Sequence, residues 1–139
     1  MKNIAYIDGS FNAKKDICGG GAVLFDQHGT EHDIKIKSRD PNLTAMRNVG
    51  GEILGAYAAI QMADDLGMET LKIVHDYSGI GCWGRGDWKT NKPWTKWYHK
   101  FVKSTSEDIN ISFEQVKGHS GNELNDKADL LAKETCGLV

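Results

Sequence analysis

The chain has 139 residues and a formal net charge of −2, with 40% hydrophobic and 26% charged residues. This length fits one domain that buries its own core without disulfides or structural metal, so we expect a single domain over residues 1–139. The slightly acidic balance argues against a protein that coats nucleic acid by bulk charge attraction.

The first part of the chain predicts three strands in an antiparallel meander. Residues 3–8 predict a strand that ends at Asp8, with Ile4, Tyr6 and Asp8 on one face and Ala5 and Ile7 on the other. Residues 19–25 predict a second strand entered through glycines, and the alternation over 31–37 predicts a third. The short gaps between these segments favour the meander.

The rest of the chain predicts helices that alternate with strands. Apolar residues from Glu52 onward recur at helical spacing, and Gly67 is a plausible stop. Two strands and three helices follow in this order: a strand over 71–76, a short helix over 78–82, a helix from Pro93 to Thr105, a strand over 111–117, and a last helix capped by Asn122. The order β-β-β-α-β-α-β-α predicts an α/β fold with a mixed five-stranded sheet flanked by helices.

The cysteines and the hydrophobic segments bear on the compartment. The three cysteines have no CxxC spacing, which indicates neither a disulfide framework nor a zinc site. The apolar run from Ile4 to Ile7 is too short for a signal peptide, and no segment approaches the length of a membrane span. We therefore expect a cytoplasmic protein that has no membrane partner.

Four carboxylates stand out by their positions. Asp8 and Asp76 each end an apolar strand, where α/β sheets bind ligands, Glu52 opens the long helix, and Asp129 lies on the last helix. Each acid taken alone is explained as a turn residue, a cap or a partner of the helix dipole. Clustered carboxylates repel unless cations lie among them, and oxygen ligands favour Mg²⁺ or Mn²⁺. Two such ions can support in-line displacement at a phosphodiester.

Four segments, in this order, resemble ribonuclease H of the type 1 family. They are YIDGSFN at 6–12, NVGGEILGAYAAI at 48–60, IVHDYSGI at 73–80 and VKGHSGNELNDKADLLA at 116–132. The resemblance implies a ribonuclease H-like fold. It also implies an endonuclease that hydrolyses the RNA strand of RNA–DNA hybrids with two Mg²⁺ ions, Mn²⁺ being a possible substitute, and leaves 5′-phosphate and 3′-hydroxyl ends.

The resemblance also assigns roles to residues. It implies that Asp8 bridges both metal ions, that Glu52 and Asp76 complete one coordination sphere, and that Asp129 supports the metal near the attacking water. Its loop histidine falls on His119, which is expected to relay a proton or to help product leave. Asp126 is the rival of Asp129, but the helix dipole explains an acid in a first turn.

Substrate contacts are expected from polar side chains near these acids and from a basic, aromatic window. Between Trp83 and Lys103 the chain has six Lys or Arg, one acid and all four tryptophans. Phosphate neutralisation and stacking are the roles of such residues. The candidates are Ser10, Asn12, Arg47, Asn48, Ser78, Trp88, Lys89 and Asn125. Ser78 stands where the family has a glutamine, and Arg47 or Thr44 where it has a phosphate-holding threonine.

The aromatic and histidine side chains of this region have structural explanations as well. We expect Trp88 to be exposed in a glycine-containing loop, and Trp94, Trp97 and Phe101 to pack into the core. His75 adjoins Asp76, but neighbours on a strand point to opposite faces, so we expect His75 to be structural.

Two alternatives to this function remain open. One is another nuclease of the same fold, such as a junction resolvase or an integrase-like strand-transfer domain. The other is a non-catalytic protein that binds hybrids, although four unneutralised carboxylates would then cost stability. We expect a monomer, and either a minimal enzyme without an N-terminal hybrid-binding module or a domain of a longer protein.

Overall fold

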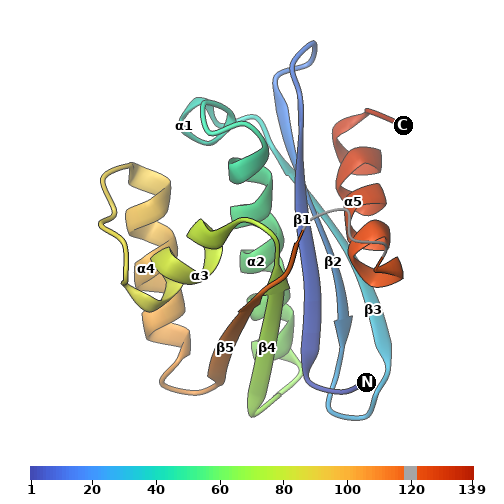
Figure 1. Ribbon diagram of the computed structural model, residues 1–139, viewed down its shortest axis with the longest axis vertical. Helices are drawn as coiled ribbons and strands as arrows, with labels where there is room; N and C mark the ends of the chain where they lie inside the picture. Colours follow the sequence, from blue (N-terminus) through green and yellow to red (C-terminus); the bar gives the residue numbers. More distant parts are fainter. Residues whose placement is uncertain (118–121) are drawn as a thin grey trace.

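The computed structural model describes residues 1–117 and 122–139. Its five-stranded sheet has the order β3-β2-β1-β4-β5, in which β1 runs antiparallel to β2 and parallel to β4 (Figure 1). The strands are β1 (Ile4–Asn12), β2 (Ile17–Phe25), β3 (Glu31–Ser38), β4 (Thr70–His75) and β5 (Asn110–Gln115). The helices are α1 (Pro41–Thr44), α2 (Asn48–Asp65), α3 (Ser78–Arg85), α4 (Pro93–Thr105) and α5 (Glu123–Cys136). The predicted mixed sheet with flanking helices is confirmed.

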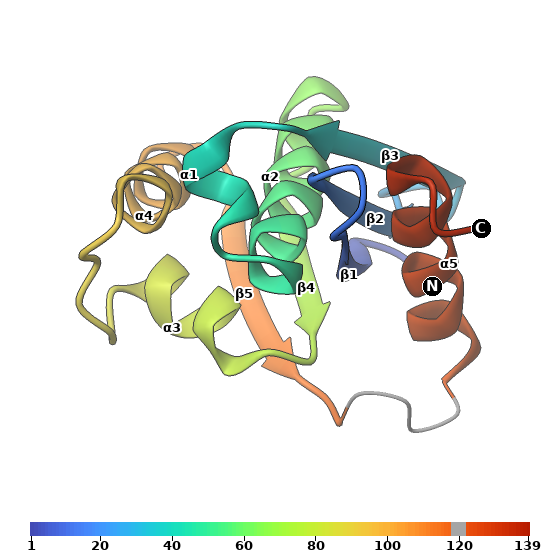
Figure 2. The ribbon, with the colours of Figure 1, turned by 90° about the horizontal axis from the view of Figure 1, so that it is seen from above.

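Helices cover both faces of the sheet. Figure 2 shows α2 and α4 on one side of the sheet and α5 on the other. The main core lies under α2 and joins buried side chains of β1, β2, β4 and α4, among them Ile7, Leu24, Ile60, Ile73 and Tyr98. A smaller cluster under α5 contains Val23, Ala128 and Leu131. The sheet is thus the middle of three layers.

The first strand is longer than predicted. We expected it to end at Asp8, but β1 continues to Asn12 and pairs with β2 along its whole length. Its pairing with β4 ends much earlier, at Tyr6 and Val74 (Figure 1). Polar residues after Asp8 remain in the strand because the antiparallel ladder with β2 satisfies their backbone groups. Asp8 therefore lies within β1, beyond its pairing with β4.

The long helix starts earlier than predicted, and a short helix precedes it. We expected a start at Glu52, but α2 begins at Asn48, and Pro41–Thr44 form α1. Glycine is a poor helix former, so the Gly50-Gly51 pair hid this first turn from the sequence pattern. Glu52 consequently lies beyond the first turn, and the helix dipole does not explain its position.

Other element ends agree with their local signals. Pro93 occupies the start of α4. The side chain of Asn122 accepts hydrogen bonds from the backbone N–H groups of Leu124 and Asn125, as expected for the cap of α5. The short third helix extends to Arg85, where Gly86 ends it at a φ of 87°.

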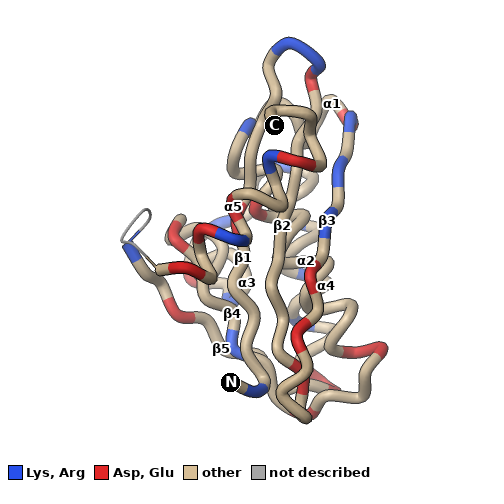
Figure 3. Tube along the Cα trace, turned by 90° about the vertical axis from the view of Figure 1, so that its right-hand side faces the viewer, with Lys and Arg blue, Asp and Glu red and all other residues tan. Residues whose placement is uncertain are grey.

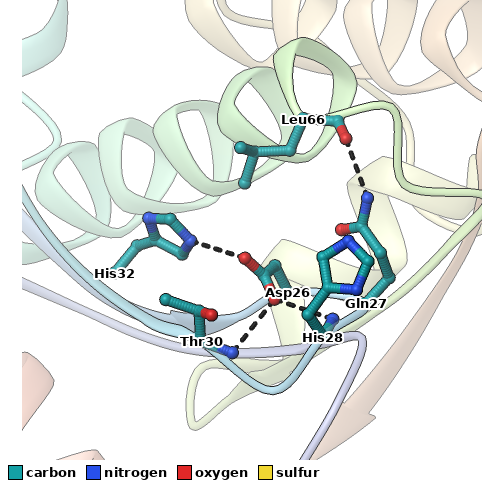
Figure 4. Close-up of polar contacts among 6 residues, drawn as sticks. All are labelled: Asp26, Gln27, His28, Thr30, His32 and Leu66. Atoms are coloured by element: carbon teal, nitrogen blue, oxygen red, sulfur yellow. Dashed lines mark hydrogen bonds and ion pairs between the residues drawn. The ribbon is translucent and has the colours of Figure 1, made fainter.

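A buried carboxylate holds the turn between β2 and β3 (Figure 4). Asp26 Oδ1 accepts hydrogen bonds from the backbone N–H groups of His28 and Thr30, at 2.8 and 3.0 Å. Asp26 Oδ2 lies 2.9 Å from Nε2 of His32, and this contact is the main reason that the pKa of Asp26 is lowered to about 2. The arrangement fixes the turn that joins β2 to β3.

No helix within residues 1–117 and 122–139 combines the length and the apolar character that a bilayer crossing requires.

Candidate active site

Three of the four predicted carboxylates meet at one point. Asp8 of β1, Glu52 of α2 and Asp76, directly after β4, each bring a carboxylate oxygen within 4.8 Å of the others. They meet where β1 extends past the last residue that it pairs with β4. Three segments that lie far apart in sequence therefore supply one cluster of oxygen ligands.

Glycines allow α2 to approach the sheet closely enough for Glu52 to reach this cluster. A Cβ atom on Gly9 would lie 2.2 Å from the backbone nitrogen of Glu52. A Cβ atom on Gly51 would lie 2.3 Å from the carbonyl oxygen of Gly19. Both distances are far below van der Waals contact, so larger residues would push the helix away. The glycines around Asp8 and Glu52 therefore set the position of the glutamate.

Burial and repulsion from neighbouring acids make the Asp8 and Glu52 carboxylates hard to ionise. Glu52 is only 5% exposed, and burial together with Asp76 raises its pKa far above its usual range. Burial, followed by the charge of Asp76, raises the pKa of Asp8 to about 7, although the N–H of Gly9 donates to its carboxylate at 2.8 Å. A cation among these oxygens would relieve both costs.

The fourth acid, Asp129, lines the same cavity. The cavity has a volume of about 640 Å³, and its lining comprises Asp8, Gly9, Ser10, Phe11, Asn48, Val49, Glu52, Asp76, Tyr77, Asp129, Lys133 and Leu138. Asp129 is half-buried, and its Oδ2 lies 2.8 Å from Nζ of Lys133 one turn later. Asp126 is exposed on α5 and is not part of this lining. The geometry thus favours Asp129 over Asp126.

Of the two histidines considered from the sequence, His119 and His75, the structure describes only His75. His119 lies outside the described residues. His75 is 2% exposed, and its Nδ1 lies 2.8 Å from the carbonyl oxygen of Tyr77. Its ring packs edge-on against Phe113, away from the cavity lining. The structural role expected for His75 agrees with this placement.

The predicted substrate contacts near the acids fall into two groups. Ser10 and Asn48 line the cavity beside the carboxylates. Asn12, in contrast, is buried, and its amide is occupied: Nδ2 donates to the carbonyl oxygen of Cys136, and Oδ1 accepts from the N–H of Lys15. Asn12 therefore ties the β1–β2 hairpin to the end of α5, and we leave it out of the proposed contacts.

Three further candidates, Arg47, Ser78 and Asn125, are not part of the cavity lining. Arg47 is exposed, has a positive φ of 54°, and holds its guanidinium 5.5 Å from the ring centre of Phe11. Ser78 begins α3 and is half-buried, as is Asn125 in the first turn of α5. Arg47 is the best placed of these to meet a phosphate, because its charge is in solvent and Phe11 lines the cavity.

The tryptophan-rich window forms an aromatic surface beside the acidic cavity. Trp88 is 41% exposed and packs edge-on against Tyr77 and Trp83, with ring centres 6.3 and 5.9 Å apart. Next to it a second cavity of about 390 Å³ is lined by Lys89 and Lys92, and it shares Val49 and Tyr77 with the acidic cavity. Lys89 and Trp88 thus lie beside a cavity that adjoins the one lined by the carboxylates.

One prediction for this window is wrong. We expected Trp97 to pack into the core, but it is 38% exposed. Thr95, Tyr98 and Val102 are the buried residues of α4. Trp97 instead stacks on Phe101 and packs at a tilt against Tyr57 at the edge of the core. Trp94 and Phe101 are half-buried and pack against the core, in line with the prediction.

Trp88→Ala should weaken hybrid binding more than it weakens the fold. The side chain is exposed, so its loss removes little buried apolar area, whereas the loss of stacking costs about 1–3 kcal/mol of affinity. Fluorescence anisotropy with a hybrid in chelator measures the affinity, and urea unfolding measures stability. Trp83→Ala is the comparison, since Trp83 packs against the core. A large loss of stability in Trp88→Ala with unchanged affinity would make Trp88 a structural residue.

Two polar residues of the acidic cavity, Tyr77 and Lys133, were not foreseen from the sequence. Tyr77 lines both cavities and contacts Trp83 and Trp88. Its position directly after Asp76 was the available signal. Lys133 faces Asp129, and the i, i+4 spacing of the pair on a predicted helix was the signal that could have found it.

Known sequences resemble this chain over nearly its whole length. The family model described as RNase H matches residues 1–137. The chain is 31% identical over 142 residues to ribonuclease H of Francisella philomiragia, and the alignment covers 94% of this chain and 88% of that protein. Ribonuclease H of Francisella tularensis subsp. novicida matches with the same identity and coverage.

Comparison with solved structures gives the same fold. RNase H1 from the archaeon Halobacterium salinarum superposes with a TM-score of 0.75 at 21% identity, over 100% of both chains. LC11-RNase H1, solved in complex with an RNA/DNA hybrid, superposes with a TM-score of 0.75 at 20% identity, over 97% of this chain and 96% of that one.

Proposed function

The chain belongs to the ribonuclease H family and is a ribonuclease H enzyme, and we propose that it hydrolyses the RNA strand of RNA–DNA hybrids at the cavity between β1, α2 and α5. The convergence of Asp8, Glu52 and Asp76 carries this proposal. The solved complex of the structurally similar LC11-RNase H1 with an RNA/DNA hybrid supports the choice of substrate.

The donor set fits divalent metal ions that prefer oxygen. Asp8, Glu52 and Asp76 would hold one Mg²⁺ ion, and Asp8 with Asp129 would hold a second. Bound there, such ions would lower the pKa of an attacking water and neutralise charge at the phosphodiester. In-line attack of that water on phosphorus, with the 3′-oxygen of the preceding nucleotide as the leaving group, would give 5′-phosphate and 3′-hydroxyl ends. The buried Glu52 fixes the cluster, because glycines hold its helix directly against the sheet. Mn²⁺ has similar ligand preferences and is the expected substitute.

Recognition of RNA requires contacts to its 2′-hydroxyls, which lie in the wide minor groove of the duplex. Ser10 and Asn48 line the cavity and offer hydroxyl and amide groups for this purpose. Arg47, Trp88 and Lys89 lie at its margins and would hold the DNA strand through phosphate and stacking contacts. Ser78, Asn125 and His119 remain proposed participants by motif position.

The protein should cut an RNA–DNA hybrid and leave duplex DNA and duplex RNA of the same sequence intact. Cutting should require Mg²⁺ or Mn²⁺ and stop in chelator. Denaturing gels of end-labelled strands measure cutting, and ligation of the products tests for 5′-phosphate ends. Comparable cutting of duplex DNA would move the protein to the resolvase-like or integrase-like nucleases of the same fold. Binding of hybrid without cutting would make it a non-catalytic hybrid-binding protein. That the protein is a monomer and is located in the cytoplasm stays a prediction.

A further inference from the structure

A lysine lies inside the proposed metal site. Nζ of Lys133 is 2.8 Å from Oδ2 of Asp129, and both side chains line the cavity that holds Asp8, Glu52 and Asp76. The other three acids gather their oxygens within 4.8 Å of one another without Asp129. Asp129 is thus the one acid of the four whose carboxylate is paired with a side-chain cation in the described structure.

The Lys133 ammonium group places a positive charge in the lining of the acidic cavity. Lys133 and Asp129 are one turn apart on α5, so the helix itself brings the pair together at the cavity. The lysine side chain is 41% exposed and the aspartate side chain 22% exposed. An ion pair of this exposure is weak, and its lysine can leave the carboxylate for solvent at little cost.

We propose that Lys133 is an internal counterion that competes with a metal ion for Asp129, an inference that rests on the proposed function. Without metal, its ammonium neutralises Asp129 and stays beside Asp8. An ion that binds to Asp129 must displace this ammonium, and the two positive charges then repel each other within one cavity. Lys133 therefore lowers the affinity for an ion at Asp129 and sets the metal concentration at which the site fills.

The same helix supplies a matched control. Lys127 is also a lysine of α5 that contacts carboxylates, but its partners are Glu31 and Asp33 on β3, outside the cavity lining. Lys127→Met and Lys133→Met change the net charge equally and keep an unbranched side chain of similar length. A difference between their effects on metal affinity is therefore a property of the cavity.

The test is a calorimetric titration of the full chain with Mn²⁺ alone, without nucleic acid. Lys133→Met should bind the ion at Asp129 about two- to fivefold more tightly than the unaltered chain, since a half-exposed ion pair no longer opposes it. Lys133→Arg should restore the original affinity, and Lys127→Met should leave it unchanged. In an Asp129→Asn background, Lys133→Met should lose most of its effect, because the competition needs both partners.

The outcomes separate this inference from the proposed function. If the unaltered chain binds no Mn²⁺ at this site, the metal-dependent function falls and the inference falls with it. If Mn²⁺ binds, but Lys133→Met has unchanged or weaker affinity, Lys133 is not a competitor and the proposed function stands. An equal gain in Lys127→Met would assign the effect to net charge and overturn the role of Lys133.

Discussion

Asp76→Asn is expected to reduce hybrid cleavage by about a thousandfold or more while the protein still folds and binds hybrid. The change keeps the shape of the side chain but replaces an anionic oxygen in the cluster formed with Asp8 and Glu52. A metal site supplies several kcal/mol of transition-state stabilisation. Loss of about 4 kcal/mol, when a ligand charge is removed, slows the reaction about a thousandfold. Single-turnover cleavage measures the rate, and anisotropy in chelator measures binding.

The control for this variant is Asp126→Asn. Asp126 is an exposed acid on α5, and it neighbours the proposed ligand Asp129 in sequence without lining the cavity. Its substitution should leave cleavage unchanged. Full activity of Asp76→Asn would contradict the metal assignment, whereas loss of activity in both variants would show that α5 tolerates no change of charge.

Asp8→Asn is expected to stabilise the metal-free protein at neutral pH even though it abolishes cleavage. Burial and the charge of Asp76 raise the pKa of Asp8 to about 7, from an ordinary value near 3.8. An acid whose pKa is raised on folding favours the folded state while it is protonated. Stability is therefore lost as the pH rises from about 4 to about 7. The amide removes this loss, which we expect to be on the order of 4 kcal/mol at pH 8.

Urea unfolding in chelator at pH 5 and pH 8 measures this effect. The gain from Asp8→Asn should be larger at pH 8 than at pH 5. Between pH 5 and about pH 7 the folded unaltered chain still holds the Asp8 proton that the unfolded chain has lost, so the stability loss keeps growing over this range. Asp64→Asn, which changes an exposed acid of α2, should show no such gain. Lower stability of Asp8→Asn at pH 8 would show that the carboxylate makes a favourable contact without metal.

Metal should remove the same penalty in the unaltered chain. Mg²⁺ binds the ionised carboxylates, so it should raise the unfolding free energy more at pH 8 than at pH 5. Asp8→Asn should respond much less, because one ligand charge is gone. This comparison tests the metal site by stability alone, without any cleavage assay.

The sequence by itself determined the elements and most of the acids. Local signals such as Pro93 at the start of α4 and Asn122 at the cap of α5 act within one turn, so the helix starts can be predicted from the sequence. The apolar run before Asp76 predicted a strand that ends beside the cavity, and the motif register singled out Asp129 over Asp126. The cavity lining agrees with that choice.

The tertiary structure alone decided how these residues meet. Asp8 lies within β1 because pairing with β2 continues past it, and pairing between distant segments leaves no local signal. Glu52 reaches Asp8 because Gly9 and Gly51 let α2 touch the sheet, and these contacts join residues more than thirty positions apart. Trp97 stays at the surface because α4 buries its other face. Periodicity encodes which face of an element is apolar, but register and close approach depend on the partner that packs against it.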